Sequence, residues 1–183
     1  GDIDRTAKMY IGGKQKRPDG GYSLDVPGGQ VGRGNRKDIR DAVAAAIKAT
    51  AWAEMSAHSR AQVLYYIAEN LEQRTEEFAS IISASTGCSD DDAATEVADS
   101  VAEWFRWAAW ADKFDGRVHE TTMHGLALAL NEAIGVVGVI CPDSRPLPGF
   151  TRLVPPLLAM GNTAVAIPSE AHQIGRASCR ARV

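Results

Sequence analysis

The chain has 183 residues, of which 45% are hydrophobic and 23% are charged, and its net charge at pH 7 is −3. These totals are typical of one globular domain with a hydrophobic core. A slightly acidic chain lacks the basic surface that binds phosphate backbones, and its longest apolar run is far shorter than the ~20 residues that span a bilayer. We therefore expect neither nucleic acid nor a membrane as a partner.

The cysteine content indicates free thiols. Cys88, Cys141 and Cys179 are odd in number and widely separated, so neither a disulfide framework nor a Cys-x-x-Cys metal site is expected. The histidines also lack metal-ligand spacing, and we expect no metal. Free thiols predict a cytoplasmic protein. The chain begins without Met and without an apolar signal-peptide core, so we expect its natural start to be missing.

Short strands are predicted first. Residues 8–13 form a strand that ends in a Gly-Gly turn, and residues 22–26 are expected to pair with it across a polar, glycine-rich stretch. Residues 27–34 are expected to be a loop.

Three helices are predicted next. Asn35 is expected to cap the first helix, with Asp38 in its first turn, and this helix runs to about residue 54. The second helix covers residues 56–86, where apolar residues recur at helical spacing. The third opens after the acidic run 90–92 and ends at Gly116. All four tryptophans lie in these helices, and we expect them to pack the helices together.

The last part of the chain predicts an α/β arrangement. Residues 126–131 alternate weakly and indicate a strand. Residues 134–140 (IGVVGVI) are nearly all apolar, which favours a strand buried on both faces. Residues 146–160 are predicted as a helix and residues 163–167 (TAVAI) as a second buried strand. A strand, a helix and a strand at this spacing predict one βαβ unit with parallel strands.

Residues 174–183 (IGRASCRARV) are rich in arginine and show no periodicity. With one base changed, they match the translation of a common sequencing adapter. We therefore predict that residues 1–173 are a partial domain and that residues 174–183 are an adapter-derived tail. The alternative is a basic arm that binds an acidic partner.

Three motifs, in order, resemble the aldehyde dehydrogenase superfamily. Residues 132–142 (EAIGVVGVICP) are similar to the family's Glu-Pro-x-Gly-Val strand and the turn after it. Residues 156–163 (PLLAMGNT) are similar to its Pro-Ala-Leu-Ala-x-Gly-Asn-Thr helix end, and residues 168–170 to its Lys-Pro-Ser-Glu. Residues 12–22 and 34–40 further resemble family-sixteen aldehyde dehydrogenases, in which two dehydrogenase-like halves share a chain and the second half is catalytically degenerate.

The resemblance implies a fold and partners. The chain is expected to hold an N-terminal helical region and the first βαβ unit of a truncated, Rossmann-like cofactor domain. The implied cofactor is NAD or NADP and the implied substrate is an aldehyde. The full-length protein is expected to be a homo-oligomer, with the strand near Leu126 in a protruding oligomerisation hairpin. The family's nucleophilic Cys and its general base Glu are implied to lie beyond the end of this chain.

The resemblance also places family positions on individual residues. Ser144 stands where the family has an Asn whose amide donates to the oxyanion, and Asp143 adds a negative charge beside it. Ile167 stands where the family has a Lys that holds the cofactor's ribose. Ser169 and Glu170 complete the cofactor-binding positions. Glu170 is either an acceptor for a ribose hydroxyl or a solvated surface carboxylate.

Two hypotheses therefore remain for the whole protein. The first is a working NAD(P)-linked aldehyde dehydrogenase whose active site lies downstream of this chain. The second is a non-catalytic half that scaffolds or oligomerises with a catalytic half, and Ser144 and Ile167 favour it. Either way, we expect the chain as given to be inactive, because Cys141, at the end of an apolar strand, is expected to be an inert core thiol.

Overall fold

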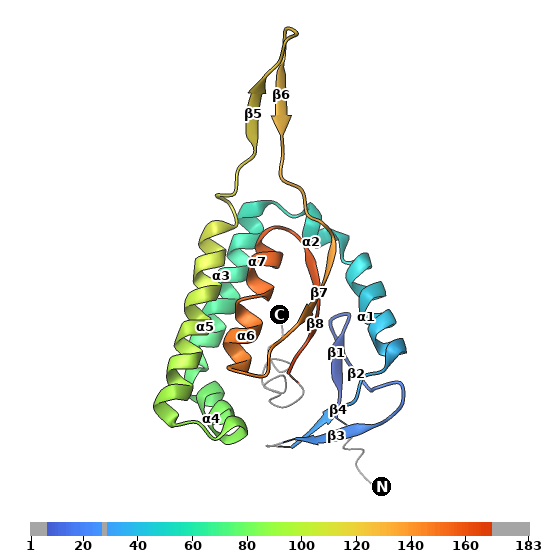
Figure 1. The fold of residues 1–183 in the computed structure, drawn as a ribbon, viewed down its shortest axis with the longest axis vertical. Coiled ribbons are helices and arrows are strands. Elements are labelled where there is room, and N and C mark those ends of the chain that lie inside the picture. The colour runs from blue at the N-terminus through green and yellow to red at the C-terminus, as the bar shows by residue number, and fades with distance from the viewer. Residues whose placement is uncertain (1–6, 27–28, 170–183) are drawn as a thin grey trace.

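The computed structural model describes residues 7–26 and 29–169. Its elements form a helical layer beside a short parallel β ribbon, with small hairpins at the N-terminal side and one long hairpin that projects from the body (Figure 1). Among the described residues, no helix combines the length and the apolar character needed to cross a membrane.

The N-terminal strands form two separate antiparallel hairpins rather than one. The strands are β1 (Met9–Ile11), β2 (Lys14–Lys16), β3 (Ser23–Val26) and β4 (Gly29–Gly32), and β1 pairs with β2 while β3 pairs with β4. The predicted pairing of residues 8–13 with residues 22–26 is wrong. The loop predicted for residues 27–34 is wrong for residues 29–32, which form β4, and residues 27–28 lie outside the described residues. Gly12 and Gly13 have φ angles of 61° and 74°. Such angles form the tight turn of a local hairpin, so β1 pairs with β2 across the two-residue turn Gly12–Gly13.

The predicted helical stretches are helical but are divided differently. The helices are α1 (Arg36–Lys48), α2 (Thr50–Glu54), α3 (Ala57–Gln73), α4 (Thr75–Thr86) and α5 (Asp90–Trp110). Breaks at Ala49 and Arg74 were not predicted, because neither position carries a Pro or Gly signal. The break at Arg74 lets α4 turn and pack against α5, which is a tertiary cause that local propensity does not encode.

Two helix ends agree with the sequence, whereas α5 ends at Trp110 and not at the predicted Gly116. Asn35 accepts hydrogen bonds from the N–H groups of Lys37 and Asp38, and the Asp38 carboxylate accepts from the Asn35 N–H, which completes a capping box. Gly87, with φ 74°, ends α4 in the left-handed conformation that glycine adopts without a Cβ clash.

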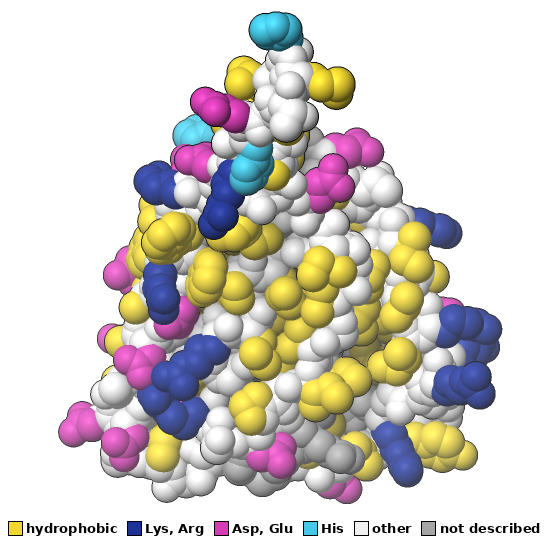
Figure 2. Space-filling view, turned by 45° about the horizontal axis from the view of Figure 1, so that its top comes forward, with side chains coloured by type: hydrophobic (Ala, Val, Ile, Leu, Met, Phe, Trp, Pro, Cys, Tyr) yellow, Lys and Arg dark blue, Asp and Glu magenta, His cyan; other side chains and the backbone are white. Residues whose placement is uncertain are grey.

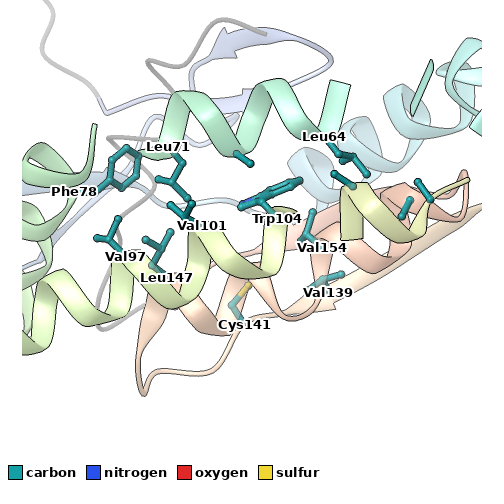
Figure 3. Close-up of a cluster of buried hydrophobic side chains, with 14 of the residues drawn as sticks. Leu64, Leu71, Phe78, Val97, Val101, Trp104, Val139, Cys141, Leu147 and Val154 are labelled. Atoms are coloured by element: carbon teal, nitrogen blue, oxygen red, sulfur yellow. The ribbon is translucent and has the colours of Figure 1, made fainter. Parts of the chain in front are cut away.

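The core lies between α3, α4 and α5 and extends to the β ribbon (Figure 3). Leu64, Ile82 and Val97 are fully buried, and Trp104 is 5% exposed. The expected packing role of the tryptophans holds for Trp104 but fails for Trp110, which is 50% exposed.

The strand predicted near residue 126 belongs to the projecting hairpin. It is β6 (Leu126–Ala129), which pairs antiparallel with β5 (Arg117–Glu120), and every residue of both strands is exposed. β5 was not predicted, because its sequence RVHE has no apolar alternation and its pairing partner alone makes it a strand.

The βαβ unit is confirmed. β7 (Val136–Ile140) and β8 (Thr163–Ile167) are parallel neighbours, and α6 (Pro146–Thr151) and α7 (Val154–Ala159) connect them. The single predicted helix is interrupted because Pro155 and Pro156 can occupy the first turn of a helix but not its interior. The prediction that residues 134–140 are buried on both faces is wrong. Val139 is 5% exposed, but Ile140, at the last position of β7, is 79% exposed. α1 contacts the face of the ribbon opposite the core at the other end of the strands, where the Thr163 hydroxyl donates to the Ala46 carbonyl at 3.3 Å.

Candidate functional site

The candidate site is the turn that follows β7. The carboxyl ends of β7 and β8 lie side by side, since Ile140 pairs with Ile167. Directly after β7, the Cys141 N–H donates to the Ile167 carbonyl at 2.9 Å and so extends the parallel pairing by one bond. The chain then turns through residues 142–145 before α6 begins at Pro146. In open α/β sheets, ligands bind beyond the carboxyl ends of the strands, which is where this turn lies.

A carboxylate is held between the two strand ends. The Ser169 hydroxyl donates to Asp143 Oδ1 at 2.7 Å. Ser169 is only 3% exposed, while the remainder of residue 143 faces solvent. This hydrogen bond holds the Asp143 carboxylate beyond the carboxyl ends of the strands and links the two segments that follow β7 and β8.

Two carboxylates of α5 contact the other end of the turn. Arg145 Nη2 donates to Asp99 Oδ2 at 2.7 Å, and this hydrogen bond raises the pKa of Arg145 further above its usual range. The Leu147 N–H donates to Glu96 Oε1 at 3.1 Å. Sequence reasoning missed both contacts of α5. The available signal was two acids three positions apart on one helix face, but the sequence does not show what such a face meets.

The positions that the resemblance assigned are partly brought together. Ser144 is exposed in the turn, between Asp143 and Arg145. Ile167 is 44% exposed at the end of β8, and Ser169 is buried against the same turn. Glu170 lies outside the described residues. Ser144, Ile167 and Ser169 therefore lie around one turn at the sheet edge.

An open groove extends from the N-terminal hairpins to Cys141 and Pro146, which flank this turn. Its volume is about 1850 Å³, and its walls include Met9 of β1, Ile39 and Ala42 of α1, and Val165 of β8. Ligand pockets usually have volumes of about 300–1,000 Å³, so the groove is larger than a small molecule requires. Figure 2 shows that hydrophobic side chains gather over much of one face of the body, with charged groups around them.

The thiols of the described residues are free. Cys88 is half-buried and Cys141 is 6% exposed. Burial raises the pKa of the Cys141 thiol, because the low-dielectric surroundings disfavour the thiolate. Cys141 is therefore a buried thiol, as predicted. No cluster of His, Cys, Asp or Glu that could hold a metal occurs within residues 7–26 and 29–169.

The chain is similar to aldehyde dehydrogenases in sequence. The model of the aldehyde dehydrogenase family matches residues 24–177. The chain is 37% identical over 139 residues to the mitochondrial aldehyde dehydrogenase family 2 member B4 of Arabidopsis thaliana, covering 74% of this chain and 26% of that protein. It is 32% identical over 178 residues to betaine aldehyde dehydrogenase of Hordeum vulgare, covering 88% of this chain and 35% of that protein.

Solved structures give the same result. An aldehyde dehydrogenase of Bacillus cereus superposes with a TM-score of 0.90 at 27% identity, covering 96% of this chain and 38% of that one. PnpE in complex with nicotinamide adenine dinucleotide superposes with a TM-score of 0.91 at 30% identity, covering 95% and 38%. The chain belongs to the aldehyde dehydrogenase family. It spans between about a quarter and two fifths of the length of these relatives.

Proposed function

We propose that this chain is part of an aldehyde dehydrogenase-like oxidoreductase that uses NAD or NADP, and that the chain alone does not oxidise aldehydes. The family match supports the first part of the proposal. The observation that carries the proposed inactivity is the Asp143 carboxylate at the carboxyl ends of the parallel strands, held by Ser169. Negative charge develops on the substrate oxygen during attack on an aldehyde, so an adjacent carboxylate opposes the reaction.

The nucleophile is the second argument for inactivity. Aldehyde oxidation in this family requires a thiolate that reaches the substrate carbonyl. Cys141 is buried and its pKa is raised, so its thiol stays protonated and is covered by packed side chains.

Cofactor binding by the chain alone is proposed to be weak. Ile167 offers no donor or charge to a ribose, and the hydroxyl of Ser169 already donates to Asp143. Ser169 and Glu170 remain the positions that would contact a cofactor in the complete protein. An aldehyde is the proposed substrate of that protein. The free thiols of Cys88 and Cys141 support a reducing, cytoplasmic location.

A second candidate function is a non-catalytic half that oligomerises. The projecting hairpin supports it, because Val118, Leu126 and Leu128 are 66%, 73% and 63% exposed. Exposed apolar side chains on a projecting element are typical of an interaction surface. The complete protein is therefore proposed to be a homo-oligomer.

The purified chain tests the first proposal. We expect no aldehyde-dependent increase in NADH absorbance above a buffer blank, with the Bacillus cereus relative assayed in parallel. Turnover by the chain would contradict the proposed inactivity.

Calorimetry with NAD tests the cofactor argument. The unaltered chain is expected to bind weakly or not at all. Ile167→Lys supplies the charged donor that the family position lacks, and we expect it to tighten NAD binding by about tenfold or more, with Ile167→Leu as the matched control. A low-micromolar dissociation constant for the unaltered chain would show that Ile167 does not limit binding.

A further inference from the structure

We propose that Glu96 and Asp99 of α5 are positioning residues, which hold the turn at residues 142–145 in one conformation and thereby orient Ser144. The inference deepens the proposed function and rests on it, because that proposal makes this turn the oxyanion side of the site. The new element is that α5, some fifty residues earlier in the chain, determines the conformation of this turn through hydrogen bonds from Arg145 and Leu147.

Glu96 makes the more buried of the two contacts. It is 6% exposed, and its Oε1 accepts from the Leu147 N–H at 3.1 Å. A carboxylate is costly to bury without hydrogen-bond donors, so a buried Glu strongly favours the conformation that presents one. A hydrogen bond to a charged acceptor is also stronger than a neutral one. Glu96 therefore fixes the backbone at the start of α6.

Asp99 lies three residues further along α5, on the same helix face. Its Oδ2 accepts from Arg145 Nη2 at 2.7 Å. The side chains of both residues are about half exposed, at 47% and 46%, so the ion pair contributes little to global stability. Its effect is local, because it determines where the Arg145 side chain lies.

The backbone of Arg145 shows that the turn is constrained. With φ 48°, Arg145 is the single non-glycine residue of positive φ among the described residues. A non-glycine residue persists in this region only where its surroundings over-determine the conformation. Glu96 and Asp99 supply that constraint after Ser144, and Ser169 holds Asp143 before it. Ser144 is therefore fixed from both sides.

Hydrogen exchange measured by NMR on the full 183-residue chain tests Glu96. Glu96→Ala should speed exchange of the Leu147 amide by about tenfold, the equivalent of one hydrogen bond. Glu96→Gln keeps an acceptor oxygen and should restore protection to within about threefold. The amide of Ala68, in the core of α3, should be unchanged in both. Unchanged Leu147 exchange in Glu96→Ala, or equal acceleration at Ala68, would overturn the positioning role.

Asp99 gives a second, independent test. Because Asp99 is exposed, this test remains available if the Glu96→Ala chain does not fold. Asp99→Asn should shift the amide resonances of Ser144 and Arg145 and speed their exchange about threefold or more, within the range of a surface ion pair. In an Arg145→Gly background, where the guanidinium is absent and φ 48° is unstrained, Asp99→Asn should have no effect on the turn. An equal effect in both backgrounds would overturn the proposal. A separate assay tests the proposed function: NADH formation by the unaltered chain would contradict that function without bearing on the positioning role of Glu96 and Asp99.

Discussion

The helical layer and the β ribbon use their apolar residues differently. In α3, α4 and α5, the apolar stripes meet one another, and Leu64, Ile82 and Val97 are fully buried. In the ribbon, Val139 is buried in the core cluster, whereas Ile140 and Ile167 are 79% and 44% exposed. Both regions carry apolar residues in sequence, but only the helical layer buries its apolar stripes.

The difference follows from the geometry of the two kinds of element. A helix of this layer needs one covered stripe, which two neighbouring helices supply. A parallel strand needs cover on both faces and a neighbour on both edges. The ribbon has two strands among the described residues, so part of its apolar surface and its outer edges stay open. Open apolar edges favour pairing with another polypeptide.

The largest effect is expected in the helical core. Leu64→Ala removes a fully buried side chain and should lower the free energy of unfolding by about 3 kcal/mol. Urea unfolding followed by circular dichroism measures it. Leu128→Ala is the matched control, because Leu128 lies in the exposed hairpin at 63% exposure, and it should change stability by less than about 0.5 kcal/mol. Similar losses for the two variants would show that the helices do not form the main core.

The reactivities of Cys88, in the helical layer, and Cys141, at the end of the β ribbon, allow the two regions to be compared. In single-cysteine chains, Cys141 should react with a disulfide reagent at least about tenfold more slowly than Cys88 near pH 8, because burial raises its pKa. The raised pKa means that its thiol favours folding below its ordinary pKa, and that this stability is lost as the pH rises through the folded-state value. The variant that keeps Cys141 carries Cys88→Ser and Cys179→Ser. The variant that keeps Cys88 carries Cys141→Ser and Cys179→Ser. Equal rates would mean that the end of β7 opens readily.

The smallest stability effect is expected on the open side of the ribbon. Ile140→Lys should alter the free energy of unfolding by less than about 0.5 kcal/mol, since Ile140 is 79% exposed. It should also reduce association measured by light scattering, because a charge on an open strand opposes pairing. Val139→Lys, at the buried neighbouring position, should instead prevent stable folding. A large loss from Ile140→Lys would contradict the exposure of this face.

Much of the fold could be predicted because its signals are local. The N-cap at Asn35, the helix end at residue 86 and the parallel pair of β7 and β8 are each predicted from short patterns. The family resemblance also located the candidate site at the turn after β7. It named Ser144, Ile167 and Ser169, and the structure brings these residues to one edge of the sheet.

The sequence by itself thus determined some element ends, such as the start of α1 after Asn35 and the end of α4 before Gly87. Only the tertiary structure decided the breaks at Ala49 and Arg74, the exposure of Ile140, and the contacts of Glu96 and Asp99 with the turn. The physical reason is that these features depend on which distant surfaces meet. A carboxylate on a helix looks the same in sequence whether it faces water or a backbone N–H fifty residues away.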